Sequence, residues 1–210
     1  CCHAYLPINL TKREMYFTWG EPFGIADTPI QDVVDLDEAG IKLEHSNRKQ
    51  GKTPTIMRCD DDGVYNQEQK TNLLLAICGD ENYNQSWHEM WEGEGTTLFR
   101  LYSFLERITA QMAIGHPGRS FCFTMDNLNV HHNPMILQLI RDTGHRYVFQ
   151  APYWSCDGAI KYVFDTIHSF LLYFWDNLET IDDLGIAIES INENDLRFFS
   201  NYFRRVGFRD

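Results

Sequence analysis

The sequence is short of positive charge and has no long apolar segment. Its 210 residues include 18 Lys and Arg against 30 Asp and Glu, which gives a formal net charge of −12. A chain this acidic repels the phosphate backbone of nucleic acid, so a nucleic-acid partner would require a basic segment elsewhere or bound metal ions. A membrane-spanning helix needs about 18 consecutive apolar residues, and the sequence has no such run. We therefore expect no membrane partner.

An initiator methionine and a secretory leader are also absent. The chain opens on Cys1-Cys2-His3, so we interpret it as a fragment of a longer protein. None of the six cysteines forms a C-x-x-C pair, and no second pair complements the first three residues as a zinc site would require. Cys78 and Cys122 lie in apolar runs, where a free thiol packs as a small hydrophobic group. We expect reduced cysteines and a reducing compartment, which is the nucleus of a eukaryotic cell or otherwise the cytoplasm.

The sequence does contain enough apolar residues for one core, at 43% of the chain. Short apolar or alternating runs predict strands at 32–37, 72–78, 120–125 and 146–150. Helical spacing of apolar residues predicts helices at 98–112, 133–144, 160–174, 182–191 and 194–206. Strands followed by helices that alternate with strands are typical of an α/β fold with a mixed sheet.

Two segments stand apart from this pattern. Residues 1–31 are spaced by prolines, and we expect them to form an approach segment ahead of one domain at 32–210. Residues 81–95 are polar, acidic and glycine-rich, which predicts a mobile loop that carries no ligand. Three tryptophans could stack on an unpaired base, although packing is the commoner role of this residue: Trp87, Trp91 and Trp154.

Carboxylates fall at the ends of two predicted strands. Asp37 ends the first of these strands, and Asp126 ends a later one. Carboxylates at the ends of neighbouring strands can converge on one point, where hard oxygen ligands suit Mg²⁺ or Mn²⁺. Two such ions can activate a water and stabilise the leaving oxygen of a phosphodiester. An Asp at the end of a strand is also a common turn former, so spacing alone leaves both roles open.

The order of these motifs resembles the catalytic domain of a DDE transposase of the Tc/mariner superfamily. That family shows a D-E-(S/T)-G strand end, a D-N-x-x-x-H segment, a G-H strand, a P-Y loop and a closing aromatic-glycine-aromatic segment. The corresponding stretches here are Asp37-Glu38-Ala39-Gly40, Asp126-Asn127-Leu128-Asn129-Val130-His131, Gly144-His145, Pro152-Tyr153 and Phe203-Arg204-Arg205-Val206-Gly207-Phe208. The resemblance runs from about residue 32 to the end of the chain.

The resemblance implies a ribonuclease-H-like α/β fold, with a mixed central sheet flanked by helices. It also implies metal-dependent cleavage and strand transfer of DNA, with Mg²⁺ or Mn²⁺ held by Asp37 and Asp126. In this family DNA ends are read by an N-terminal DNA-binding module, which is absent here, so residues 1–31 would be a remnant of the connecting region. The resemblance leaves open whether the chain forms a homodimer.

Other motif residues are expected to support the metal ligands or to contact DNA. Glu38 should point away from Asp37 because side chains alternate along a strand, which favours a supporting role for it. Asn127 is expected to fix the turn after its strand, and His131 to hold that loop by a hydrogen bond or to help position DNA. The closing helix is locally basic, so Arg204 and Arg205 are candidate phosphate contacts, although such charges often only face solvent.

The chain departs from the family at the third acid. That acid follows the second with 34 residues between them, which places it at residue 161, and the residue there is Lys161. An ammonium group at this point would pair with Asp37 and Asp126 and take the place of the metal. Asp157 lies four residues before Lys161 and Asp165 four after it, so either could replace the lost acid, Asp157 from a loop that could swing in.

These observations leave two functions open. The first is an enzyme that cleaves and joins DNA with two metal ions, using Asp37, Asp126 and a substitute third acid. The second is a decayed or repurposed domain that keeps the fold and perhaps contact with nucleic acid or another partner, and Lys161 favours it.

Overall fold

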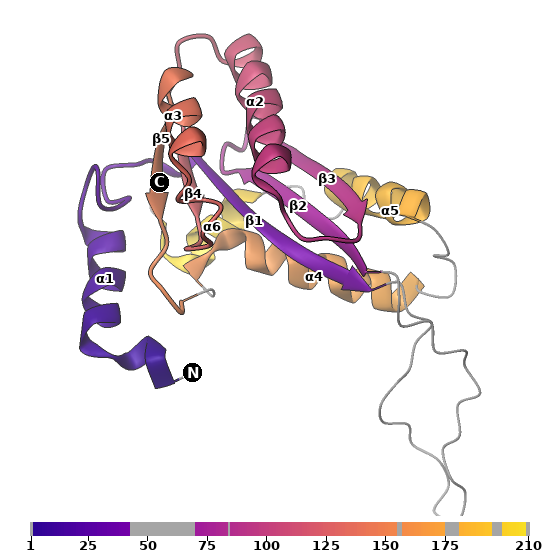
Figure 1. Cartoon of the computed structure of the whole chain (residues 1–210), viewed down its shortest axis with the longest axis horizontal. Coiled ribbons are helices and arrows are strands. Elements are labelled where there is room, and N and C mark those ends of the chain that lie inside the picture. The colour runs from indigo at the N-terminus through magenta and orange to yellow at the C-terminus, as the bar shows by residue number, and fades with distance from the viewer. Residues whose placement is uncertain are drawn as a thin grey trace, which may run out of the picture.

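The computed structural model describes residues 2–42, 70–83, 85–154, 157–174, 181–194 and 199–208. Its centre is a five-stranded mixed sheet with the order β3-β2-β1-β4-β5 (Figure 1). β1 pairs antiparallel with β2 and parallel with β4; β2 pairs antiparallel with β3, and β4 pairs parallel with β5. The strands are β1 Val33–Lys42, β2 Lys70–Cys78, β3 Ser86–Glu92, β4 Cys122–Met125 and β5 Arg146–Phe149.

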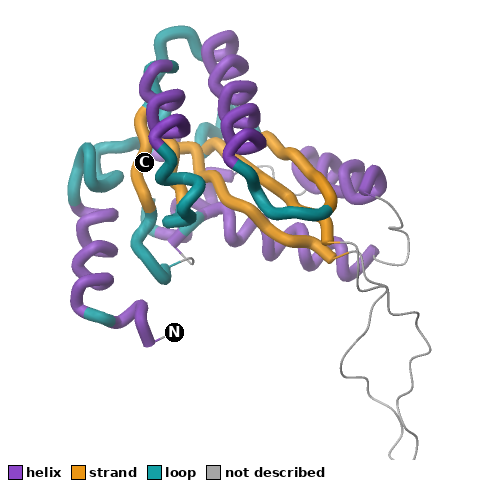
Figure 2. The backbone as a smooth tube through the Cα atoms, viewed as in Figure 1, coloured by secondary structure: helices purple, strands orange, loops and turns teal. Residues whose placement is uncertain are grey.

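Helices cover both faces of the sheet (Figure 2). α2 and α3 pack on one face, and α4, α5 and α6 on the other, whereas α1 lies beside the β5 edge (Figure 1). The α-helices are α1 Pro7–Thr18, α2 Leu98–Gly115, α3 Pro134–Asp142, α4 Ala159–Phe174, α5 Ile181–Asn194 and α6 Phe199–Val206. Two short 3-10 helices, η1 Cys2–Tyr5 and η2 Ile30–Asp32, precede α1 and β1.

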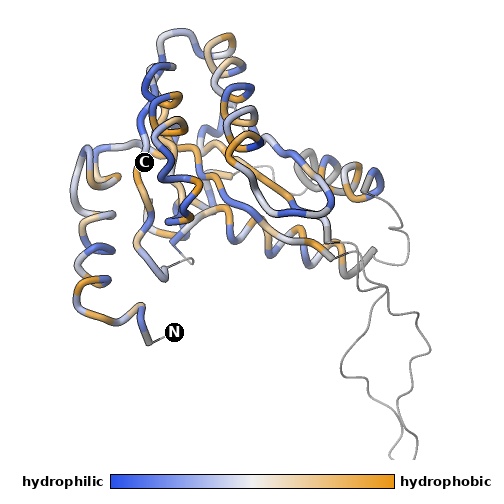
Figure 3. Tube along the Cα trace, viewed as in Figure 1, coloured by the Kyte–Doolittle hydropathy of each residue, from blue (hydrophilic) through white to orange (hydrophobic). Residues whose placement is uncertain are grey.

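The apolar run in β2 explains how the two layers share one sheet. Leu73, Leu75 and Ile77 belong to the core on the α4 side, whereas Leu74 and Ala76 belong to the core on the α2 side. A strand covered on both faces needs no polar side, which is why residues 73–78 of β2 are continuously apolar (Figure 3). The same alternation in β1 places successive side chains on opposite faces of the sheet.

The predicted strands and helices are confirmed where the structure describes them, apart from two corrections. The first concerns residues 81–95, where part of the predicted mobile loop is the edge strand β3. Trp87 and Trp91 are buried on the face covered by α2. Glu89 lies between the two tryptophans on the same face, so the sequence does not show an apolar strand face. In the fold, Arg100 and Arg107 of α2 bind its carboxylate at 2.9 and 3.1 Å. A charged residue between two buried tryptophans hides the strand in the sequence, because its neutralising partners in α2 become neighbours only in the fold.

The second correction concerns Asp37, which lies within β1 rather than at its end. β1 continues to Lys42 because β2 pairs with it from Val34 to Lys42, and Asp37 stands opposite Leu75 in that register. Residues 7–18 also form a helix, α1, within the stretch that the sequence analysis treated as an approach segment. Its Tyr16 is buried in the α4-side core together with Phe203 of α6.

Two further expectations can be compared with the described residues. Cys78 and Cys122 are free and buried, as their apolar surroundings predicted. Among the described helices, none has the length and apolar character needed to cross a membrane.

The two-layer core predicts unequal effects for two phenylalanines of α2. Phe104 is fully buried against the sheet, whereas Phe99 is 80% exposed. Phe104→Ala should lower the free energy of unfolding by about 3–5 kcal/mol, because it removes buried apolar contacts and leaves a cavity. Phe99→Ala serves as the matched control and should change it by less than about 0.5 kcal/mol. Urea denaturation followed by circular dichroism measures both, and equal losses would contradict this packing.

Candidate metal site

Asp37 and Lys161 form the centre of the candidate site. The Asp37 side chain is 5% exposed, and its Oδ2 atom forms an ion pair with Nζ of Lys161 in the first turn of α4. Burial raises the pKa of the Asp37 carboxyl, and the charge and hydrogen bond of Lys161 oppose that rise. The ammonium group therefore stands against the first acid of the motif, as the spacing predicted for residue 161.

Asp126 follows β4, the parallel neighbour of β1. Leu36 stands opposite Met125, so Asp37 and Asp126 are the residues that follow this pair, and the charge of Asp126 helps to raise the pKa of Asp37. Burial alone would raise the pKa of Asp126. Hydrogen bonds from His131 and from the Leu128 N–H, at 2.8 and 3.0 Å, and the charges of His131 and Lys161 outweigh burial and lower that pKa.

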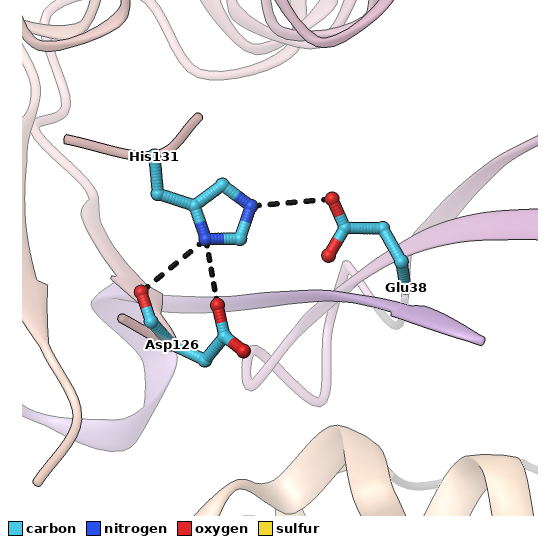
Figure 4. Close-up of side chains that lie close together, drawn as sticks. All are labelled: Glu38, Asp126 and His131. Atoms are coloured by element: carbon cyan, nitrogen blue, oxygen red, sulfur yellow. Dashed lines mark hydrogen bonds and ion pairs between the residues drawn. The ribbon is translucent and has the colours of Figure 1, made fainter. Parts of the chain in front are cut away.

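His131 joins Asp126 to Glu38 on the other face of β1 (Figure 4). Its Nδ1 atom lies 2.8 Å from Oδ1 of Asp126, and its Nε2 atom lies 3.3 Å from Oε1 of Glu38. Burial disfavours the charged ring, but the two carboxylates outweigh burial and raise the pKa of His131 to about 10. The ring is thus an imidazolium that donates to both acids and ties the loop after β4 to β1.

Glu38, Asp126 and His131 also satisfy the spacing of a metal site, since one ligand atom from each lies within 4.8 Å of the others. Their present arrangement does not favour an ion, however. The two ring nitrogens of His131 already bind carboxylates on opposite sides of the ring, and a protonated nitrogen has no lone pair to coordinate a metal. These three residues are better described as an ion-paired triad.

Asp157, the predicted substitute for the third acid, is engaged by α1. Arg13 binds both of its carboxylate oxygens, with Nε 2.6 Å from Oδ2 and a terminal nitrogen 2.8 Å from Oδ1. The guanidinium of Arg13 also lies 4.3 Å from the ring centroid of Trp154. Asp165, the other candidate, is exposed on α4. With Lys161 on Asp37 and Arg13 on Asp157, this donor set does not fit a pair of divalent cations.

The remaining predicted residues have identifiable partners. The Asn127 side chain donates to the Gln150 carbonyl at 2.6 Å, which fixes the turn after β4. Arg204 pairs with Glu81 at 2.8 Å, and Arg205 lies 4.3 Å from the centroid of the Tyr162 ring. Each of the three tryptophans donates its indole N–H within the chain: Trp87 to Gln111, Trp91 to the Glu94 carbonyl and Trp154 to the Ala4 carbonyl. For Trp87 and Trp91, burial confirms packing rather than base stacking.

Sequence analysis missed one acid, Asp35. Its side chain has no exposed surface, and it accepts hydrogen bonds from Thr124, Gln150 and the Ile160 N–H at 2.7, 2.8 and 2.9 Å. Burial raises the pKa of Asp35 to about 7, although the bonds from Ile160 and Thr124 oppose the rise. The sequence does contain a signal that could identify Asp35: it lies two residues before Asp37, which places both acids on one face of β1.

The strand order, the helices on both faces and an acid-bearing central strand define a ribonuclease-H-like fold of the DDE transposase type. No protein-family model matches the sequence, and neither does any curated protein. Solved structures do match. They confirm the Tc/mariner transposase-like fold that the sequence motifs predicted.

Structures of Mos1 transposase are among those that match. The Mos1 strand transfer complex superposes with a TM-score of 0.72 at 13% identity, over 94% of this chain and 57% of that chain. The Mos1 catalytic domain with raltegravir and Mn gives 0.67 at 12% identity, over 94% and 86%. A Mos1 paired-end complex with Mg gives 0.68 at 14%, over 84% and 52%. This chain thus spans little more than half of the transposase chain in the strand transfer and paired-end complexes, and at such identities the likeness shows the fold alone.

The triad around His131 predicts a pH dependence of stability. A pKa raised from 6.5 to about 10 on folding means that the folded protein holds this proton more tightly than the unfolded chain. The resulting stabilisation is complete below pH 6.5 and is lost as the pH rises through about 10. Urea unfolding across this range should show the decline, and a His131→Gln variant should show less of it. The His131 signal in an NMR titration can be assigned by its loss in His131→Gln, and titration of that signal near pH 6.5 in the folded protein would contradict the triad.

Proposed function

We propose that this chain is a DDE transposase-type domain that engages DNA, and that Lys161 holds its metal-dependent cleavage and strand transfer silent. The ion pair between Lys161 and Asp37, at the position of the family's third acid, is the observation that carries the proposal. The fold supports the class of function, because the similar structures are transposase chains in strand transfer and paired-end complexes, some with Mg or Mn.

Electrostatics explain why one lysine would have this effect. A bound Mg²⁺ or Mn²⁺ would activate a water and stabilise the leaving oxygen of a phosphodiester. A protonated lysine cannot coordinate a cation, because it has three donors and no acceptor. It also repels the ion, by about 4 kcal/mol for each pair of unit charges at 4 Å and an effective dielectric constant of 20. Lys161 therefore replaces the metal as the partner of Asp37.

The described cations give this domain little attraction of its own for DNA. Most of the described arginines bind carboxylates within the chain: Arg13, Arg100, Arg107, Arg119, Arg146 and Arg204. A cation paired in this way contributes less to phosphate binding than a free one. In our proposal, DNA affinity therefore depends on a further DNA-binding module, and the Mos1 chains in DNA complexes are longer than the part covered here.

Exchange of Lys161 should switch metal binding on. Lys161→Glu should bind Mn²⁺ at least about tenfold more tightly than the natural chain, since a repelling charge becomes a ligand. Lys161→Gln is the matched control, because it removes the charge without supplying a carboxylate, and its affinity should be intermediate. Isothermal titration calorimetry measures all three. Equal affinities of the natural chain and Lys161→Glu would show that residue 161 does not face the metal.

The same titrations test Asp157 as a substitute ligand. Asp157→Asn, introduced into Lys161→Glu, should change the Mn²⁺ affinity by less than about threefold, because Arg13 binds both oxygens of Asp157. Asp126→Asn in the same background should abolish binding. If Asp157→Asn abolishes it as well, Asp157 is a ligand and the enzyme hypothesis recovers. Nicking of supercoiled plasmid DNA by the natural chain in Mn²⁺ would overturn the silent state directly.

A further inference from the structure

A buried hydrogen-bond network lies beneath the site and connects the segments around it. At its centre is Asp35 of β1, whose side chain is wholly enclosed. Its Oδ1 atom accepts from the Thr124 hydroxyl of β4 and from Nε2 of Gln150, which follows β5. Its Oδ2 atom accepts from the backbone N–H of Ile160 in α4. One carboxylate thus joins β1, β4, the segment after β5 and α4.

The bond to Ile160 fixes the start of α4. The first N–H groups of a helix have no acceptor within the helix, and a carboxylate is their most favourable partner. α4 begins at Ala159, so Ile160 is its second residue and Lys161 its third. Because Asp35 and Asp37 share one face of β1, the strand that carries Asp37 also holds the backbone just before residue 161.

Gln150 extends the network to the second acid. Its side chain donates to Asp35 at 2.8 Å, its N–H donates to the Met125 carbonyl at 2.8 Å, and its own carbonyl accepts from Asn127 at 2.6 Å. Met125 and Asn127 flank Asp126 in the sequence. The backbone of Gln150 thus holds the loop that bears Asp126, and its side chain binds Asp35, which holds the start of the helix that bears Lys161.

Gly158 shows how closely the chain approaches this pair. A Cβ atom at this position would lie 3.0 Å from Nε2 of Gln150 and 3.4 Å from Oδ2 of Asp35. A glycine lets the segment before α4 close on the network without displacing either side chain. Burial of a carboxylate is costly unless its partners are all in place, so the network holds one arrangement rather than a range of them.

We infer that Asp35 is a positioning residue: it sets the place of residue 161 against Asp37, whichever side chain residue 161 carries. The inference has two parts. The first part, that Asp35 affects metal binding at residue 161, rests on the proposed function. The second part, that Asp35 positions Lys161 against Asp37 in the natural chain, does not depend on the proposed function.

A double-mutant cycle tests the second part. Lys161→Met, Asp37→Asn and their combination give the coupling between the two residues, independently of overall stability. In an Asp35→Leu background, where Ile160 loses its acceptor, this coupling should be lost. Asp35→Asn keeps an acceptor oxygen for Ile160 and should retain most of it. Ile108→Ala is a control, because Ile108 of α2 is buried in the core on the other face of the sheet. It should lower the free energy of unfolding and leave the coupling intact.

Gly158→Ala provides a second test if Asp35→Leu does not fold. It removes no charge and no hydrogen-bond partner, yet its Cβ presses on Gln150 and Asp35, so the coupling should fall. Full coupling in Gly158→Ala, or in a folded Asp35→Leu variant, would overturn the inference.

Metal titration tests the first part and separates the two proposals. In the Lys161→Glu background, Asp35→Leu should weaken Mn²⁺ binding about 10-fold to 100-fold, which is the usual effect of losing a residue that orients metal ligands. Asp35→Asn should weaken it less. Unchanged affinity in Asp35→Leu would overturn the positioning role and leave the proposed function intact. If Lys161→Glu itself binds no Mn²⁺, the metal site of the proposed function fails, and the double-mutant cycle still decides the role of Asp35.

Discussion

A carboxylate without access to water is the constraint on which this structure depends. Asp35 lies between the sheet and α4, and each of its hydrogen-bond donors comes from a different element. Such a group is tolerated inside a protein only when hydrogen bonds replace the water that it has lost. The requirement fixes β4, the segment after β5 and the start of α4 relative to β1. Apolar packing alone would permit small shifts among them.

The site above this network is balanced by the charges of the chain itself. Lys161 pairs with Asp37, the imidazolium of His131 lies between Asp126 and Glu38, and Arg13 binds Asp157. Acids gathered on neighbouring central segments repel one another unless cations lie among them. In a metal-dependent nuclease those cations would be divalent ions. In this chain Lys161, His131 and Arg13 lie among the acids in that way.

The same principle accounts for the rest of the surface. The chain is strongly acidic, yet many of its carboxylates have a cationic partner, such as Glu89 between Arg100 and Arg107. These pairs link α2 to β3 and α6 to the turn after β2, through Arg204 and Glu81. Exposed pairs add little stability individually. The larger consequence of these ion pairs is that the arginines in them would contribute less to phosphate binding than free arginines.

The sequence by itself determined the layers of the fold and the residue at the third acidic position. Continuous apolar runs predicted the central strands and helical spacing predicted α2 to α6, whereas the resemblance to the transposase family supplied the spacing that placed Lys161 at the third acidic position. These features follow from periodicity and motif spacing, which are local properties of a chain. Only the tertiary structure decided which partner each charge has. Arg13 binds Asp157 across 144 positions, and Asp35 meets Ile160 across 125. No local pattern specifies such distant pairs, because the packing of the sheet against α1 and α4 brings them together.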